Sequence, residues 1–308
     1  MNGFVLSGAA NLGSIQAGML KALLKAGITP DVFVGTSIGA VNAAFLAADP
    51  TLDQAEALCE LWSEARAREI FPPNPWVIGR ALFRQGSLFP SDPWRRFLEG
   101  RLPYERIEEA SVQLRITATD FDDGKPVVLD SGPVVEAILA STALPCVFPP
   151  HQIGDRLYLD GALSDQVPLK PAIEAGADTV YVMAVNVPRP PPDRRSPGSI
   201  LRHSFTILLF PRIRLDALDL PARHPDLRIV QVPSVSTQVS LWDMSRHGEL
   251  IERAYDEVTR FLAERESEHQ EQEPRAHVAS VPETEVEAEL QQATGPENRS
   301  ADGAQSDA

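Results

Sequence analysis

The sequence predicts an α/β domain built on a mainly parallel β-sheet that is covered by helices. Residues 3–8 form a short apolar run, and residues 31–35 form a second one. Each run is followed directly by a segment with apolar residues at helical spacing, at 13–27 and 38–48. The order strand, helix, strand, helix within the first 50 residues is typical of a parallel sheet with helices packed on it.

The later segments continue this alternation. Helices are expected at 52–67, 133–144, 169–178 and 243–264 because apolar residues recur there at helical spacing. Strands are expected at 112–120, 125–132, 156–163, 179–187 and 227–233, the first two paired around a turn at 121–124. The folded body is therefore expected to be one domain, residues 1–264.

The end of the chain differs from this body in composition. Residues 264–308 hold 12 Asp and Glu against 3 Arg and contain no aromatic residue, whereas the whole chain is 43% hydrophobic. Such a segment buries too little apolar surface to offset the entropy that is lost on ordering. Residues 265–308 are therefore expected to form a disordered acidic tail.

Composition also narrows the class of protein. The formal net charge is −15 and Lys and Arg are not clustered, so no nucleic-acid partner is expected. The sequence shows no secretory signal and no run of about 18 apolar residues. Cys59 and Cys146 fit inert thiols in a reducing compartment better than a disulfide. We expect a cytoplasmic protein and leave peripheral contact with a membrane open; the sequence does not indicate an oligomeric state.

Ser37 lies in the stretch FVGTSIGAVN, residues 33–42, between a predicted strand and a predicted helix. In this context the G-x-S-x-G pattern is typical of a nucleophile elbow. Gly35 and Gly39 let the strand and the helix approach closely, and the serine hydroxyl projects from the edge of the sheet. The positive end of the following helix points to the same place. A tight turn that merely contains a small residue is the alternative.

A nucleophilic serine needs a base, and a Ser-His-Asp triad is the first arrangement to test. His151, His203, His224 and His247 do not lie at the ends of expected strands, and an elbow after a single strand is early for an α/β-hydrolase. Asp160 ends an apolar strand, where desolvation would raise its pKa and let the carboxylate accept a hydroxyl proton. A plain turn aspartate before glycine is the competing interpretation.

Residues 7–14, SGAANLGS, form a small-residue turn between the first strand and the first helix. We expect the backbone amides of Gly8, Ala9 and Ala10 to face the same edge as Ser37. There they would stabilise the negative charge that develops in acyl transfer, and losing one such donor costs roughly 3 kcal/mol of barrier. The turn also reads as a variant dinucleotide fingerprint, but the acid that would bind ribose begins the second strand rather than ending it.

These three segments together resemble the patatin-like phospholipases. The signature of that family is a glycine-rich oxyanion turn, a G-x-S-x-G elbow soon after it, and a distant D-G-A or D-G-G aspartate. The sequence has GAANLG at 8–13, GTSIG at 35–39 and DGA at 160–162. Residues 127–150 and 158–185 match as well, and the resemblance covers residues 3–262.

The resemblance implies a three-layer α/β/α patatin-like fold and a site that acts without a metal or other cofactor. Ser37 would be the nucleophile and Asp160 its base, in a Ser-Asp dyad. The oxyanion hole would be formed by Gly8, Ala9, Ala10 and Gly13. The implied reaction is hydrolysis of a lipid acyl ester, of the phospholipase A or lysophospholipase type, through an acyl-serine intermediate. The substrate would be a lipid or another acyl ester.

Two departures from the family's pattern bear on activity. Ala9 and Ala10 stand where the turn usually has glycines, and alanine adopts a positive φ less easily. Leu12 stands where Arg or Lys is frequent, which removes a cation that would orient the turn or hold an anionic head group. A catalytically weak or inactive lipid-binding or scaffold protein on the same fold is therefore the alternative function.

Residues 70–100 concentrate aromatic and arginine side chains in a chain with only 6% aromatic residues. Bulky apolar residues beside arginines suit a flap that touches a membrane. A small satellite core is the alternative. The aromatic residues concerned are Phe71, Trp76, Phe83, Phe89, Trp94 and Phe97.

Overall fold

The computed structural model describes residues 1–71, 79, 87–185, 196, 199–200, 224–237 and 244–272. Residues 1–265 form one compact unit and residues 266–308 a second. The sheet and the buried residues that surround the candidate site all belong to the first unit.

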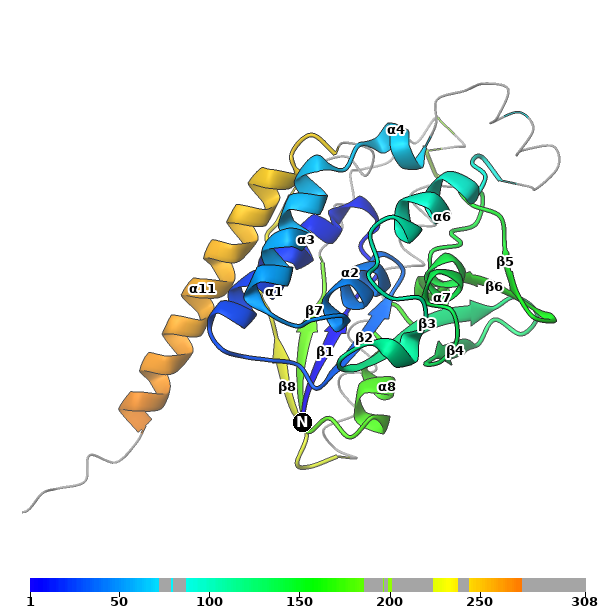
Figure 1. Ribbon diagram of the computed structural model, residues 1–308. Coiled ribbons are helices and arrows are strands. Elements are labelled where there is room, and N and C mark those ends of the chain that lie inside the picture. The colour runs from blue at the N-terminus through cyan, green and yellow to red at the C-terminus, as the bar shows by residue number, and fades with distance from the viewer. Residues whose placement is uncertain are drawn as a thin grey trace, which may run out of the picture. The chain divides into compact units, whose positions relative to one another are not determined.

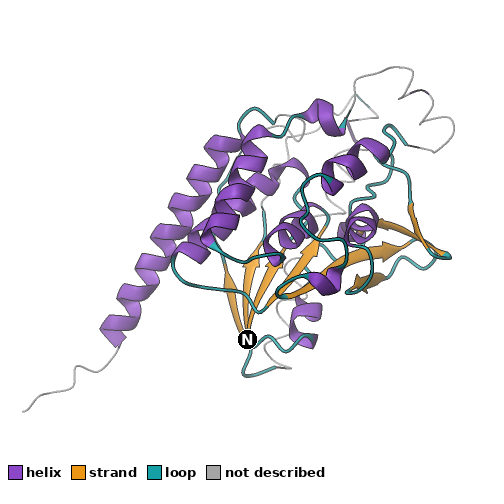
Figure 2. Ribbon diagram, in the orientation of Figure 1, coloured by secondary structure: helices purple, strands orange, loops and turns teal. Residues whose placement is uncertain are grey.

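A mixed sheet forms the centre of the fold (Figure 2), with eight strands among the described residues. The strand order is β5-β6-β3-β2-β1-β7-β8, and β4 pairs with β3 outside this path. Five neighbouring strands run parallel to one another: β3, β2, β1, β7 and β8. β4 and β6 run antiparallel to β3, and β5 runs antiparallel to β6. The strands are β1 (Asn2–Leu6), β2 (Val32–Thr36), β3 (Gln113–Asp120), β4 (Pro126–Leu129), β5 (His151–Ile153), β6 (Arg156–Asp160), β7 (Thr179–Met183) and β8 (Arg228–Gln231).

Helices pack on both faces of this sheet (Figure 1), so the predicted α/β class with a mainly parallel sheet is confirmed. Short 3-10 turns follow β1, precede β3 and follow β6: η1 (Ala10–Leu12), η2 (Ile107–Glu109) and η3 (Gly161–Leu163). The helices are α1 (Gly13–Lys25), α2 (Ile38–Ala47), α3 (Leu52–Glu64), α4 (Ala67–Ile70), α6 (Asp92–Glu99), α7 (Val134–Ser141), α8 (Leu169–Glu174) and α11 (His247–Gln272).

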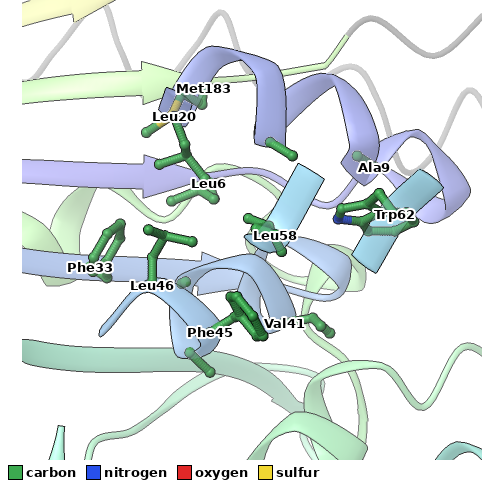
Figure 3. Packing of buried hydrophobic residues seen from close by; sticks show 14 of the residues in the cluster. Leu6, Ala9, Leu20, Phe33, Val41, Phe45, Leu46, Leu58, Trp62 and Met183 are labelled. Atoms are coloured by element: carbon green, nitrogen blue, oxygen red, sulfur yellow. The ribbon is translucent and has the colours of Figure 1, made fainter. Parts of the chain in front are cut away.

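The alternation of side chains along the strands divides the core into two apolar clusters. Leu6 of β1 and Phe33 of β2 point to the face covered by α2 and α3, where Figure 3 shows them with Leu46 and Leu58. The apolar cluster on the opposite face is smaller and includes residues of α8. Its members include Val5, Val32, Val34, Leu169, Ala172, Val180 and Val182.

The closing helix α11 packs against α1 at very short range. A Cβ built on Gly18 would lie 2.3 Å from the carbonyl oxygen of Ile251, so only glycine allows the two backbones to come this close. Leu250 and Ala254 are fully buried, and Lys25 donates to the Tyr255 hydroxyl at 2.7 Å. These contacts fix α11 against α1.

Some elements differ from the sequence-based expectation. The closing helix was expected at 243–264, whereas α11 begins at His247 and continues to Gln272. Residues 273–308, most of the expected tail, lie outside the described residues. α6 and β5 were not expected. Cys59 and Cys146 are both free thiols. Within the described ranges, no helix combines the length and the apolar character needed to cross a membrane.

Candidate active site

Ser37 occupies a sharp, strained turn between β2 and α2. Its backbone has φ 54° and ψ −127°, a conformation that non-glycine residues rarely adopt. The flanking glycines make this turn sterically possible. A Cβ on Gly35 would lie 2.5 Å from the Cα of Ala40, and a Cβ on Gly39 would lie 2.5 Å from the carbonyl oxygen of Leu6. The pattern thus forms the strand-turn-helix geometry of a nucleophile elbow.

The backbone amide of Ser37 is held by a buried serine from α7. It donates to the Oγ of Ser141 at 2.8 Å, and that hydroxyl donates to the carbonyl of Thr117 at 2.6 Å. Ser141 is fully buried. The sequence reasoning missed this residue; its only signal is a serine at the end of an apolar helix. Because its amide is engaged, Ser37 does not itself supply an oxyanion donor in this conformation.

Asp160 reaches Ser37 across one intervening strand. Thr36, at the end of β2, pairs with Thr117 of β3, while Asp160, at the end of β6, pairs with Ala118 on the other side of β3. The two strand ends therefore lie level although β6 runs in the opposite direction. As a result the Oγ of Ser37 donates a hydrogen bond to the Oδ2 of Asp160 at 2.7 Å.

The carboxylate of Asp160 lies almost completely out of solvent, with 3% of the residue exposed. Its Oδ1 accepts from the amide of Ala162 at 2.9 Å, and its own amide donates to the carbonyl of Ala143 at 3.0 Å. Burial raises the pKa of Asp160 to about 6, against the opposing effect of the hydrogen bonds from Ser37 and Ala162. Near neutral pH such a group is ionised and is more basic than an exposed aspartate.

The predicted oxyanion turn lies between β1 and η1 and differs in one respect from expectation. The amide of Gly8 donates to the carbonyl of Gln166 at 3.2 Å, so this amide is already engaged and is not a free donor. No hydrogen bond to another described residue uses the amides of Ala9 and Ala10. Ala10 has φ 48°, the left-handed conformation that its glycine-like position requires at some cost for alanine.

Gly13 contributes to this turn through packing. A Cβ at this position would lie 2.5 Å from the indole of Trp62, so glycine lets α1 approach α3. The carbonyl of Gly13 accepts from the side chain of Asn42 at 3.0 Å, and Asn42 in turn accepts from the Nε1 of Trp62 at 2.8 Å. Asn42 also donates to Gln16 at 3.0 Å. This buried network anchors the end of the turn and was not foreseen from the sequence.

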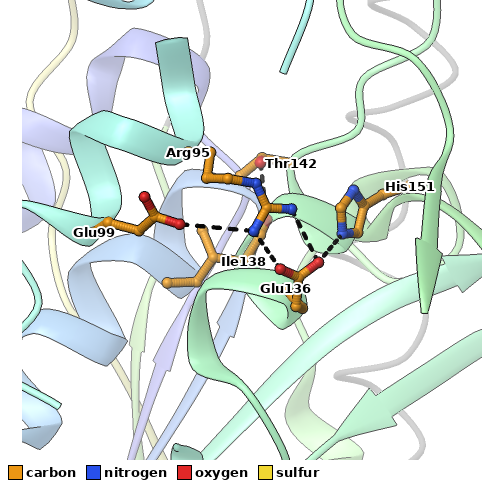
Figure 4. A network of polar contacts seen from close by, with 6 residues as sticks. All are labelled: Arg95, Glu99, Glu136, Ile138, Thr142 and His151. Carbon is orange, nitrogen blue, oxygen red and sulfur yellow. Dashed lines mark hydrogen bonds and ion pairs between the residues drawn. The ribbon is translucent and has the colours of Figure 1, made fainter. Parts of the chain in front are cut away.

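His151 and His247 are engaged away from Ser37. The Nε2 of His151 lies 2.8 Å from Glu136 Oε2, and Arg95 pairs with the same carboxylate (Figure 4). Burial lowers the pKa of His151, although Glu136 opposes this effect. The Nδ1 of His247 lies 2.9 Å from the carbonyl of Trp62. The hydroxyl of Ser37 is hydrogen-bonded to a carboxylate instead of an imidazole. His224 is exposed, and His203 lies outside the described residues.

An apolar cavity of about 170 Å³ opens beside Ser37 and Asp160. Trp94 and Phe97 line it and are buried, and the Nε1 of Trp94 donates to Thr142 at 2.9 Å. Trp94 and Phe97 thus belong to the core, and Phe71 and Phe89 are partly buried against it. Trp76 and Phe83 lie outside the described residues. The lining comprises Ala10, Asn11, Ser37, Ile38, Val41, Leu61, Trp62, Ala65, Ile70, Phe71, Trp94, Phe97, Thr142, Leu144, Val147, Phe148, Asp160 and Met244.

Comparison with known proteins identifies curated relatives along part of the chain. A patatin-like phospholipase domain-containing protein of Cryptococcus neoformans is 29% identical over 191 residues, which covers 53% of this chain and 22% of the relative. Lysophospholipase nte1 of Aspergillus terreus is 27% identical over 184 residues, covering 59% of this chain and 12% of the relative. The chain thus spans less than a quarter of the length of these relatives.

Two solved structures also align, at low identity. VipD from Legionella pneumophila is 14% identical with a TM-score of 0.47, covering 85% of this chain and 67% of that one. Human GIVD cytosolic phospholipase A2 in complex with methyl gamma-linolenyl fluorophosphonate is 15% identical with a TM-score of 0.44, covering 86% and 58%. The family model described as patatin-like phospholipase matches residues 4–173, more than half of the sequence. The chain belongs to the patatin-like phospholipase family.

Proposed function

We propose that the protein is a serine acyl hydrolase that cleaves lipid acyl esters, of the phospholipase A or lysophospholipase type. Ser37 is the nucleophile and Asp160 its base. The observation that carries this proposal is the 2.7 Å hydrogen bond from the hydroxyl of Ser37 to the buried carboxylate of Asp160, beside an apolar cavity. A hydroxyl and a base in direct contact next to an apolar binding space are the parts that acyl transfer from a lipid requires.

In the acylation step, the Oγ of Ser37 attacks the ester carbonyl carbon while its proton passes to Asp160. The carbonyl oxygen becomes an oxyanion. The proposed donors to it are the amides of Ala9 and Ala10, which have no acceptor among the described residues. The tetrahedral intermediate then collapses, and the bond to the leaving alcohol breaks. Asp160 returns the proton to that alcohol, which leaves an acyl-serine ester and an ionised carboxylate.

Deacylation repeats these steps with water. Asp160 accepts a proton from a water molecule as the water oxygen attacks the acyl-serine carbonyl. The second tetrahedral intermediate expels the Ser37 oxygen, which takes the proton back from Asp160. A pKa of about 6 suits this role, because the group is ionised at neutral pH and still binds a proton readily in the transition state.

The cavity indicates which part of the substrate lies where. Its lining beyond Ser37 and Asp160 is almost entirely apolar and includes the aromatic side chains of Trp62, Trp94 and Phe148, which suits an acyl chain. Leu12, at the position where relatives often carry a cation, is fully buried in the core. That position therefore provides no charge for an anionic head group, and we propose that the acyl chain contributes most of the recognition.

A serine-directed fluorophosphonate probe and a lipid panel test this function. Ser37→Ala should abolish both labelling and hydrolysis, and Asp160→Asn should slow both by roughly 10³-fold or more. Ser63→Ala is the matched control, because Ser63 is an exposed serine on α3 whose hydroxyl bonds only to the carbonyl of Cys59 among the described residues. If the folded wild type hydrolyses no lipid and is not labelled at Ser37, the non-catalytic lipid-binding alternative takes its place.

A further inference from the structure

Gln166 holds Gly8, the residue before the two amides of the oxyanion turn that have no acceptor in the described part of the chain. Its main-chain carbonyl accepts from the amide of Gly8 at 3.2 Å, and its side-chain Nε2 donates to the carbonyl of Gly8 at 3.3 Å. Gln166 is buried, with 2% of the residue exposed. One residue, 158 positions further along the chain, therefore fixes both polar groups of the Gly8 backbone.

The side chain of Gln166 is kept there at an energetic cost. Its Oε1 is buried and has no hydrogen-bond partner among the described residues. Burying an unpaired amide oxygen is unfavourable, and an unbranched apolar side chain of similar length would avoid it. In return, the Nε2 of Gln166 supplies a donor to the carbonyl of Gly8, which an apolar side chain would leave without one.

The bond from Gln166 fixes the direction of the next amide. The peptide between Gly8 and Ala9 is trans, so its carbonyl and its N–H point in opposite directions. Because Gln166 holds the carbonyl on its own side, the N–H of Ala9 points away from Gln166. A Cβ built on Gly8 would lie 3.9 Å from the Cγ of Gln166 and 3.5 Å from the Cβ of Ser37, so Gly8 lies close to both side chains.

The preceding peptide is fixed in the same manner by a second glutamine. The Nε2 of Gln16 donates to the carbonyl of Ser7 at 2.9 Å, and the amide in that peptide, which belongs to Gly8, points to the carbonyl of Gln166. Two successive peptide planes are thus held by buried glutamine amides. The amide of Ala9 is the first in the turn without an acceptor among the described residues.

We propose that Gln166 is a positioning residue for the oxyanion hole, which holds the Gly8–Ala9 peptide so that the amide of Ala9 is directed at the oxyanion formed on acylation of Ser37. This inference rests on the proposed hydrolase function. A donor to the oxyanion acts in the transition state and not on the bound ester, so its misalignment lowers kcat and leaves KM unchanged.

The test compares Gln166→Met with Gln54→Met on a soluble aryl ester. Gln54 is a matched control because its Nε2 also donates to a main-chain carbonyl, that of Phe45 at 3.2 Å, outside the cavity. For Gln166→Met, kcat should fall roughly tenfold to 100-fold with KM within about twofold, and fluorophosphonate labelling should slow by a similar factor. The pH dependence of kcat/KM should keep its midpoint, because the surroundings of Asp160 are unchanged. Gln54→Met should retain wild-type rates.

Gln166→Glu provides a second measurement that does not depend on the methionine variant folding well. A protonated carboxyl donates to the carbonyl of Gly8 and an ionised one does not. The ratio of variant to wild-type kcat should therefore rise as the pH falls from 8 to 5.5.

Four results would overturn the inference. The first is a folded Gln166→Met protein whose kcat lies within twofold of the wild-type value. The second is a loss of kcat/KM that comes from a higher KM instead of a lower kcat, and the third is an equal loss of kcat in Gln54→Met. The fourth is a ratio of Gln166→Glu to wild-type kcat that does not change with pH. A wild type that is neither labelled at Ser37 nor active on any ester removes the proposed function itself, and this inference with it.

Discussion

Replacing Asp160 with asparagine should stabilise the fold while it destroys activity. The carboxylate is buried, and burial raises its pKa from 3.8 to about 6. The folded state therefore binds this proton more tightly than the unfolded state, so stability is lost as the pH rises through the interval from 3.8 to about 6. Asparagine does not ionise, and its amide retains an acceptor for Ala162 and gains a donor for Ser37.

The size of this effect follows from the two pKa values. Their difference corresponds to about 3 kcal/mol at pH 8, where the wild type carries the full cost of ionising Asp160 in the core. At pH 4.5 the cost is about 1 kcal/mol, because the folded protein keeps its proton. Asp160→Asn should therefore unfold at a higher urea concentration than the wild type. The difference in the free energy of unfolding between the two proteins should grow by about 2 kcal/mol from pH 4.5 to pH 8.

Urea unfolding of both proteins, followed by tryptophan fluorescence at the two pH values, measures this difference. Asp123→Asn is the control, because Asp123 is an exposed turn residue whose pKa is lowered by its hydrogen bond with Lys125. That variant should gain no stability at pH 8. Two results would refute the argument that Asp160 is a desolvated base. One is an Asp160→Asn protein that is no more stable than the wild type, and the other is a stability difference of the same size at both pH values.

Four further outcomes are expected. First, kcat/KM on a neutral ester should fall about tenfold per pH unit below about 6 and level off above it, because Asp160 must be ionised; a profile flat down to pH 5 would exclude it as the base. Second, Gly39→Ala should fail to fold stably, since its Cβ would lie 2.5 Å from the carbonyl of Leu6; native-like circular dichroism and an unchanged melting temperature would contradict this. Third, Ser141→Ala should lose about 1–3 kcal/mol in urea unfolding because the elbow amide loses its acceptor, and an unchanged midpoint would argue against that contact. Fourth, removing residues 273–308 should leave the ester hydrolysis rate and melting temperature within error of the full chain, whereas a large change in either would assign the acidic segment a role.

The sequence was sufficient for the elements that depend on local pattern. The elbow around Ser37 was predicted because its glycines, strand and helix are contiguous, and the structure shows why those glycines are needed. Asp160 was singled out because an apolar strand ends at it. The direction of β6 was not predictable, because side-chain alternation is the same in parallel and antiparallel strands.

The contacts between distant segments were likewise beyond sequence reasoning. The engaged amide of Gly8 and its partner Gln166 are separated by 158 positions, and no local pattern links them. The same holds for the bond from Ser37 to Ser141, across 104 positions. Identifying such pairs requires the sheet register and the helix packing, which only the folded structure provides.

The return of β6 along β3 has a consequence for where the protein tolerates added sequence. The far ends of this antiparallel region are the tight bends at Gly124 and Gly154, both with a positive φ and open space around the missing side chain. Loops lengthened there are expected to extend outward without displacing Ser37 or Asp160. The bend at Gly161 has no such freedom, since a Cβ there would lie 2.1 Å from the carbonyl of Thr117. Insertions in this chain should therefore be tolerated at the first two bends, whereas the third must keep its length.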